Sequence, residues 1–159
     1  MRRLTVAAAL AAAVLAGTAS AQQAGPPAIG EPISLELAQK ILAAAQAEAK
    51  KNNWSMAVAI VEPNGSLVAF QKMDNTQYGS INVAMDKATS AALYRRPTAA
   101  FYNALKAGNT YVMQLRGANA VPGGLPIVVG GKLVGGIGSS GGTGEQDTQI
   151  SEAGLTAVK

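Results

Sequence analysis

The sequence of 159 residues contains neither cysteine nor histidine, and aromatic residues make up only 4% of it. Without cysteine the chain can form no disulfide, no thiolate nucleophile and no covalent attachment to a c-type haem. Without histidine it can build neither a Ser-His-Asp triad nor a zinc site of cysteine and histidine ligands, and it offers no imidazole to a haem iron. We therefore expect no metal site. The available chemistry rests on tyrosine, methionine, lysine, arginine, hydroxyl and carboxylate side chains and on backbone amides.

Residues 1–21 have the three parts of a secretory signal peptide. A start with two arginines precedes an apolar run too short to span a bilayer, and small residues at Ala19 and Ala21 form a cleavage site. Cleavage after Ala21 leaves 138 residues and lowers the formal net charge from +4 to +2. No stripe of basic residues remains that would suit nucleic acid. The sequence predicts an exported protein, periplasmic or secreted, without a membrane span.

The rest of the chain reads as a flexible leader over 22–33, rich in glycine and proline, followed by one domain over 34–159. After Ser34, a capping residue, apolar residues recur at helical spacing to about residue 52. Next we expect a strand hairpin over 56–73 that turns at Asn64-Gly65. A helix capped by Ser80 and a shorter helix capped by Thr98 follow it. The last expected elements are a hairpin over 126–134 that runs on to Ser140, and a final helix with a Thr143–Gln146 capping box. This order predicts an antiparallel α+β domain.

Glycine occupies 10 of the 25 positions in the segment 123–147. Such a segment lets a ligand or another stretch of backbone approach closely. The run Ser139 to Gly144 leads directly into the final helix, where free backbone amides can bind a carboxylate or a phosphate. The alternative is a tight strand-to-helix turn whose own Glu145 and Asp147 already serve the helix dipole, and the spacing alone favours this alternative.

Several motifs occur in an order that resembles one family. They are Met73-Asp74, Asp86-Lys87-Ala88, Arg95-Arg96-Pro97-Thr98, the run Pro122 to Ile127, and the glycine-rich run Val134 to Asp147. Together they resemble the GlcG/HbpS family, also found as the C-terminal domain of PduO-type proteins, and the resemblance covers about residues 34–158. It implies a profilin-like fold, a five-stranded antiparallel sheet flanked by helices. It also implies a homo-oligomer and a small-molecule ligand, which for some members is haem.

The resemblance implies a set of ligand-binding residues. Since histidine is absent, the candidate axial ligands of a haem are Tyr78, Tyr94, Tyr102, Tyr111, Met85 and Met113. The alternatives are a hydroxyl such as that of Thr98, or a purely apolar pocket. The candidate carboxylate-binding or pocket residues are Lys87, Arg95, Arg96, Thr98, Gly123, Gly124, Gly141, Gly142 and Thr143.

Most of these residues also have a purely structural interpretation. Met85 has the helical spacing of a core residue, and Tyr102 that of a half-buried amphipathic side chain. The two arginines can bind the last carbonyls of the preceding helix. Lys87 can form a solvated pair with the neighbouring Asp86.

Three hypotheses about function follow. The first is an exported small-ligand-binding protein, with haem as the leading ligand. The second is an enzyme acting on a small organic acid or aromatic compound, with Lys87 or Asp147 as acid or base and the glycine-rich helix start as carboxylate site. The third is an oligomeric accessory subunit of an exported system. No nucleophile stands beside a base at a recognisable spacing, which disfavours the enzyme.

Overall fold

Strand β5 (Lys132–Ser140) is the centre of a five-stranded sheet in the computed structural model, which describes residues 25–158. One edge of β5 pairs with β4 (Gly124–Val129). The other edge pairs first with β1 (Ala28–Ile29) and then with β2 (Ala57–Val61), beside which lies β3 (Leu67–Lys72). All these pairs are antiparallel except β1 with β5, which is parallel. The predicted α+β class with a five-stranded, mostly antiparallel sheet is therefore confirmed, and the parallel pair of β1 with β5 is the one departure from antiparallel pairing among the described strands.

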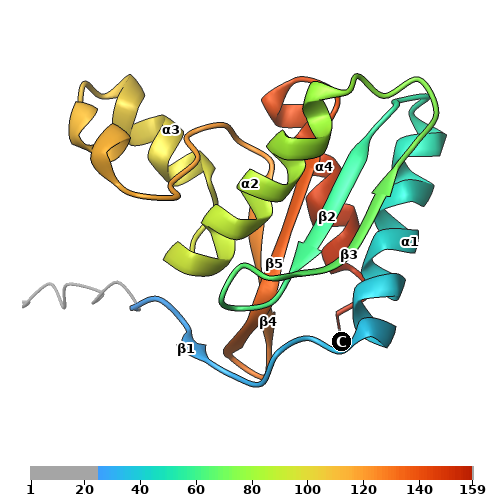
Figure 1. Ribbon diagram of the computed structural model, residues 1–159, viewed down its shortest axis with the longest axis horizontal. Coiled ribbons are helices and arrows are strands. Elements are labelled where there is room, and N and C mark those ends of the chain that lie inside the picture. Colours follow the sequence, from blue (N-terminus) through green and yellow to red (C-terminus); the bar gives the residue numbers. More distant parts are fainter. Residues whose placement is uncertain (1–24, 159) are drawn as a thin grey trace, which may run out of the picture.

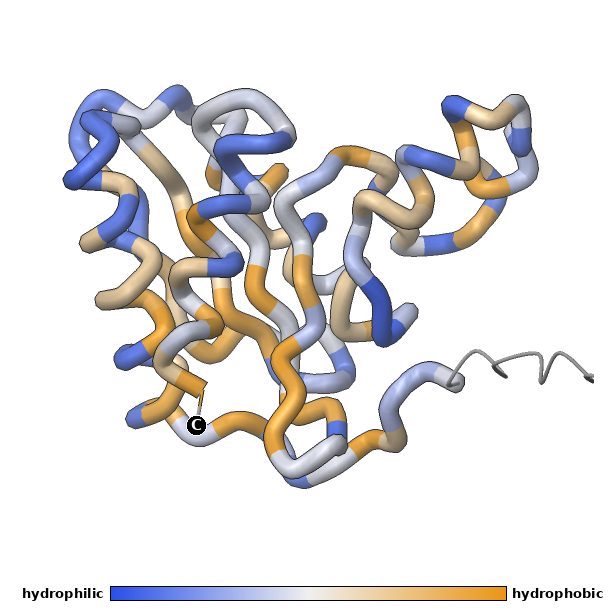
Figure 2. Tube along the Cα trace, turned by 180° about the vertical axis from the view of Figure 1, so that it is seen from behind, coloured by the Kyte–Doolittle hydropathy of each residue, from blue (hydrophilic) through white to orange (hydrophobic). Residues whose placement is uncertain are grey.

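Helices cover both faces of the sheet (Figure 1). Helix α1 (Leu35–Lys51) and helix α4 (Gly144–Leu155) lie side by side on one face, and α2 (Gly79–Tyr94) lies on the other. Strand β2 is buried along its whole length because it contacts both layers. Its Val58 and Ile60 belong to the larger apolar core under α1 and α4, and its alternate residues face α2. The hydropathy colouring in Figure 2 shows the apolar residues gathered along these central strands.

Small residues let α2 pack closely against the sheet. The layer between them consists largely of alanines from β2 and α2. A Cβ atom on Gly136 would meet the backbone oxygen of Ala88, and one on Gly138 would meet that of Ala84. Gly136 and Gly138 are therefore required by packing against α2, since any side chain at either position would push the helix away.

The helix starts agree with the sequence at two positions and differ at two. Ser34 accepts a hydrogen bond from the Leu37 amide at 3.3 Å, and Thr143 forms the predicted capping box of α4. The prediction that Ser80 caps α2 is wrong, because α2 begins at Gly79 and Ser80 lies inside its first turn. The Ser80 hydroxyl is buried and hydrogen-bonded to that of Ser140. Thr98 does precede helix α3 (Ala99–Lys106), but its side chain makes no capping bond. Both hydroxyls have partners from elsewhere in the fold, which local spacing does not reveal.

Both predicted hairpins are present. The turn between β2 and β3 contains Gly65 at a φ of 88°. The turn between β4 and β5 contains Gly130 and Gly131, at 55° and 76°. Positive φ at both central residues of a two-residue turn is the type I′ pattern that joins twisted antiparallel strands. After α3 the chain forms a short 3-10 helix, η1 (Thr110–Gln114), and the two together project from one end of the sheet (Figure 1).

The leader is partly built into the fold. Within the span 22–33, Ala28–Ile29 forms β1, and the Ile33 side chain is only 6% exposed. The amide of Gly30 also donates to the carbonyl of Leu133 in β5. The expectation of a flexible leader is therefore wrong for its second half, which is hydrogen-bonded to the sheet. Residues 1–21, the expected signal peptide, lie outside the described residues. Among residues 25–158, no helix is long and apolar enough to cross a membrane.

Candidate functional site

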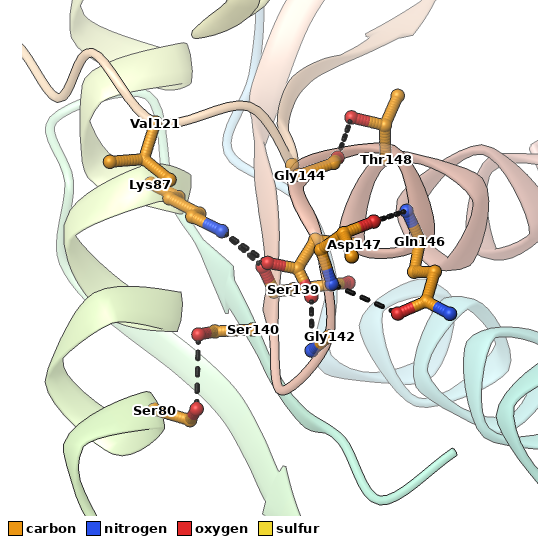
Figure 3. A network of polar contacts seen from close by, with 12 residues as sticks. Ser80, Lys87, Val121, Ser139, Ser140, Gly142, Gly144, Gln146, Asp147 and Thr148 are labelled. Carbon is orange, nitrogen blue, oxygen red and sulfur yellow. Dashed lines mark hydrogen bonds and ion pairs between the residues drawn. The ribbon is translucent and has the colours of Figure 1, made fainter.

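A buried ion pair lies where α2, β5 and the start of α4 meet (Figure 3). The ammonium of Lys87 lies 2.6 Å from a carboxylate oxygen of Asp147 and donates a second bond, at 3.0 Å, to the carbonyl of Ser139. The two side chains are only 1% and 4% exposed. The sequence interpretation of Lys87 as partner of Asp86 is wrong, since the pair joins residues 60 positions apart.

The surroundings of Asp147 stabilise its charge in part. Its other carboxylate oxygen accepts the amide of Gly142 at 3.0 Å. Burial raises the pKa of Asp147, and the hydrogen bonds from Lys87 and from the Gly142 amide oppose that rise. Since Lys87 and Asp147 are both shielded from solvent, a substrate cannot reach them in this arrangement. The geometry gives no support to the hypothesis that either one acts as a general acid or base.

Two glycines make room for the ion pair. A Cβ atom on Gly123 would lie 2.7 Å from the Asp147 side chain and 3.1 Å from the Lys87 ammonium. One on Gly124 would overlap the Lys87 backbone. The motif that begins at Pro122 therefore serves close packing around the pair, and these two candidate ligand residues lie in the interior.

Hydroxyl groups complete this polar interior. The Thr98 hydroxyl donates to the carbonyl of Val121 at 2.7 Å and accepts the amide of Gly124 at 3.0 Å. Ser151 donates to the carbonyl of Gly123 and lies 2.8 Å from the hydroxyl of Ser139. Thr98 is fully buried, and these bonds engage its oxygen as both donor and acceptor. The network therefore anchors the loop before β4 rather than presenting groups to a ligand.

The glycine-rich start of α4 supplies its own hydrogen-bond acceptors. The Thr143 amide donates to the side-chain oxygen of Gln146 at 2.9 Å, and the Gly142 amide donates to Asp147. Gly141 has φ of 155° and packs against the backbone of Ser55. Because two of the amides expected to bind an anion already have partners within the chain, the geometry favours a self-capped turn over a carboxylate site.

Arg95 and Arg96 border a solvent-accessible groove of about 550 Å³. Arg95 ends α2 in the left-handed conformation, at φ of 53°, and its guanidinium donates to the carbonyl of Pro27. Arg96 donates to the carbonyl of Tyr94, and its guanidinium lies 5.9 Å from the Phe101 ring centroid. Within residues 25–158, neither arginine forms an ion pair with a carboxylate.

The remaining wall of this arginine groove is apolar. It is formed by Pro26, Pro27, Pro97 and Ala100, together with Gly25. The groove thus combines nonpolar contacts with two cations that have no carboxylate partner within the described part of the chain. That combination suits a planar apolar molecule that carries carboxylates.

The six candidate axial ligands are scattered. Tyr78, Tyr111 and Met113 are 83%, 63% and 68% exposed, and Tyr102 is 43% exposed. The Tyr94 hydroxyl donates to the carbonyl of Arg116, and Met85 packs against the alanine layer under α2. None of the six is among the described residues that line the arginine groove.

Comparison with known proteins places this geometry in a family. A family model described as haem degrading protein HbpS-like matches residues 33–156. The chain belongs to the HbpS-like family. Protein GlcG of Escherichia coli K12 is 37% identical over 108 residues, which cover 68% of this chain and 81% of GlcG.

Solved structures of other proteins have the same fold. A double mutant of Streptomyces reticuli HbpS is similar at a TM-score of 0.76 and 28% identity, covering 98% of this chain and 99% of that one. The structure of a PduOC:heme complex is similar at a TM-score of 0.73 and 23% identity, covering 80% of this chain and 96% of the other.

Sequence reasoning missed the pairing of Lys87 with Asp147. A signal was available, because Lys87 lies three residues after Ala84 and next to Ala88, within the apolar face of α2. A charged residue on such a face needs an opposite charge in the core. The distance along the chain between α2 and α4 hides which carboxylate that is.

Proposed function

We propose that this protein is an exported small-ligand-binding protein that binds haem in the arginine groove through the haem carboxylates. The observation that carries this proposal is the pair of guanidinium groups, Arg95 and Arg96, that face an apolar groove without a carboxylate partner among the described residues. A planar guanidinium forms strong paired hydrogen bonds with a carboxylate. The description of the family and the haem complex of PduOC support haem as the ligand.

The described residues of the groove suit the propionates and the porphyrin ring of a haem, and they include no usual ligand for its iron. Arg95 and Arg96 would hold the propionates, while Pro26, Pro97 and Ala100 would pack against the ring. Bound haem supplies an iron centre for redox chemistry or for binding small ligands. Because no tyrosine or methionine among residues 25–158 lines the groove, the described residues would bind the edge and the face of the ring and would not ligate its iron.

Export and self-association complete the proposal. Residues 1–21 have the pattern of a cleaved signal peptide, and the predicted homo-oligomer follows the family resemblance. Mass spectrometry of the mature protein, after expression of the full chain in a Gram-negative host, tests the first point. An N-terminus at Gln22 in the periplasmic fraction is the expected result, and an intact Met1 in the cytoplasm would contradict it.

The ligand is tested by parallel titrations with haemin and with iron-free protoporphyrin, followed by visible absorption. Recognition through carboxylates predicts saturable binding of both, with dissociation constants within about threefold of each other. Arg95→Ala and Arg96→Ala should each weaken the binding of both ligands by about 1 kcal/mol, or roughly fivefold, which is the upper end of the range for an ion pair in contact with solvent. Arg116→Ala is the matched control, because Arg116 is exposed and lies outside the groove.

Two results would overturn this assignment. Binding of haemin with no binding of protoporphyrin would show that an iron ligand, and not the arginine pair, holds the ring. Binding of neither would remove haem as the ligand.

A further inference from the structure

A second groove, of about 490 Å³, lies between α3 and α4. One wall is a single face of α4, made of residues at positions i, i+3, i+4 and i+7: Glu145, Thr148, Gln149 and Glu152. The opposite wall is the face of α3 that carries Ala99, Tyr102 and Asn103. Pro122 and Gly144 join the two walls, and this α3–α4 groove shares no lining residue with the arginine groove.

Two carboxylates dominate the charge of the α3–α4 groove. Within residues 25–158, neither Glu145 nor Glu152 forms an ion pair. The pKa of Glu145 lies below its usual range because its own backbone amide and the Thr143 hydroxyl bind the carboxylate, so it is ionised at neutral pH. The other polar side chains of this wall are occupied, since Thr148 donates to the carbonyl of Gly144 and Gln149 to Glu48.

An apolar surface lies along the same groove. The Tyr102 ring is 43% exposed, and Ala99 and Pro122 add nonpolar contacts. An aromatic face attracts cations as well as methylene groups. The α3–α4 groove therefore offers negative charge and nonpolar contact together, a combination that repels the carboxylates of a haem and suits an organic cation.

The spacing of the two carboxylates defines the length of that cation. Glu152 lies seven positions after Glu145, and a rise of about 1.5 Å per residue places their Cα atoms about 10 Å apart along the helix. An extended chain advances about 1.2 Å per bond, so about eight carbons are needed between two ammonium groups to cover that distance.

We propose that the α3–α4 groove binds a linear diamine of the polyamine class, with one ammonium at each glutamate. The methylene chain lies along Tyr102 and Pro122. This assignment is independent of haem, because the two ligands carry opposite charges and use different grooves.

The test is calorimetric titration of the purified protein at low ionic strength with 1,4-diaminobutane, 1,8-diaminooctane and 1,12-diaminododecane. The eight-carbon diamine should bind most tightly. Octylamine, which has the same chain and one ammonium, should bind at least threefold more weakly than 1,8-diaminooctane. Added salt should weaken binding, since both carboxylates are in contact with solvent.

Variants connect the binding to the groove. Glu145→Gln and Glu152→Gln should each raise the dissociation constant of 1,8-diaminooctane by about two- to fivefold, the range expected for loss of one exposed ion pair. Glu36→Gln is the matched control, since it removes a carboxylate from the first turn of α1 and should leave affinity unchanged. The variants Arg95→Ala and Arg96→Ala should also leave it unchanged, which separates this proposal from the binding of haem.

Three outcomes would overturn the proposal. Equal affinity for all chain lengths would indicate unspecific attraction of counterions. Unchanged affinity in both glutamate variants would place the amine elsewhere. A change of molecular mass in solution on Tyr102→Ala, without saturable diamine binding to the parent protein, would show that the α3–α4 groove is covered by a second copy of the chain.

Discussion

Removing the ammonium of Lys87 tests whether the buried ion pair organises the interior. Lys87→Met keeps much of the side-chain volume and leaves Asp147 without its closest partner, in a site where the carboxylate is 4% exposed. Breaking a buried pair in this way destabilises a protein by about 3–5 kcal/mol. A domain of this size has about 5–15 kcal/mol of stability in total, so the variant should be close to unfolding at pH 7.

The loss should depend on pH, with a definite sign. Burial already raises the pKa of Asp147 above its unfolded value, and loss of the Lys87 ammonium raises it further. A group whose folded pKa is raised contributes stability that is present below the unfolded pKa and lost as pH rises through the folded pKa. The deficit of Lys87→Met should therefore be largest at neutral pH and shrink as Asp147 takes up a proton in acid.

Urea unfolding followed by the fluorescence of Trp54 measures this effect. Trp54 is the only tryptophan in the chain and packs against the core under α1 and α4. Adding Asp147→Asn to Lys87→Met should restore part of the stability at pH 7, because the uncompensated charge is then gone.

The control is Lys40→Met, which breaks an exposed pair with Glu36 at the same distance of 2.6–2.7 Å. Its loss should be about 0–1 kcal/mol. A loss in Lys87→Met no greater than that of Lys40→Met would refute the argument from burial, as would a deficit that grows in acid.

Three further predictions concern packing and hydrogen bonds in the fold. Gly138→Ala should cost about 1–3 kcal/mol of unfolding free energy, because the new Cβ meets the backbone of Ala84, whereas Gly79→Ala, in open space, should cost nothing; urea midpoints compare the two. Thr143→Ala should lower stability by about 0.5–2 kcal/mol through loss of the α4 cap, seen as a lower melting temperature by circular dichroism. Thr98→Val should cost about 1–3 kcal/mol, because it leaves the Gly124 amide without its acceptor, and hydrogen exchange at that amide should speed up.

Local patterns in the sequence predicted the elements whose causes are local. Helix α1 begins where Ser34 accepts an amide, and the hairpin between β2 and β3 turns at Asn64-Gly65. The capping box of α4 is also visible in the sequence, since it needs only Thr143 and Gln146 three positions apart. The family followed from the order of the motifs, and the comparisons confirm it.

Contacts between segments that are distant in the sequence could not be predicted from such local patterns. Ser80 fits a helix cap by spacing, but its hydroxyl bonds with Ser140 from β5. The leader fits a flexible segment by composition, but Ala28–Ile29 pairs with the open edge of β5. In both cases a tertiary contact offered a partner that local propensity does not include.

The sequence by itself determined the chemistry available to this protein, because the absence of cysteine and histidine holds in any fold. It also determined the α+β order of elements, since periodicity and turn residues act over short distances. Only the tertiary structure decided the use of each charged residue. It placed Lys87 against Asp147 in the interior and left Arg95 and Arg96 facing an open groove. The physical reason is that burial, which decides whether a charge is neutralised within the chain or remains available to a ligand, depends on how α2, β5 and α4 pack.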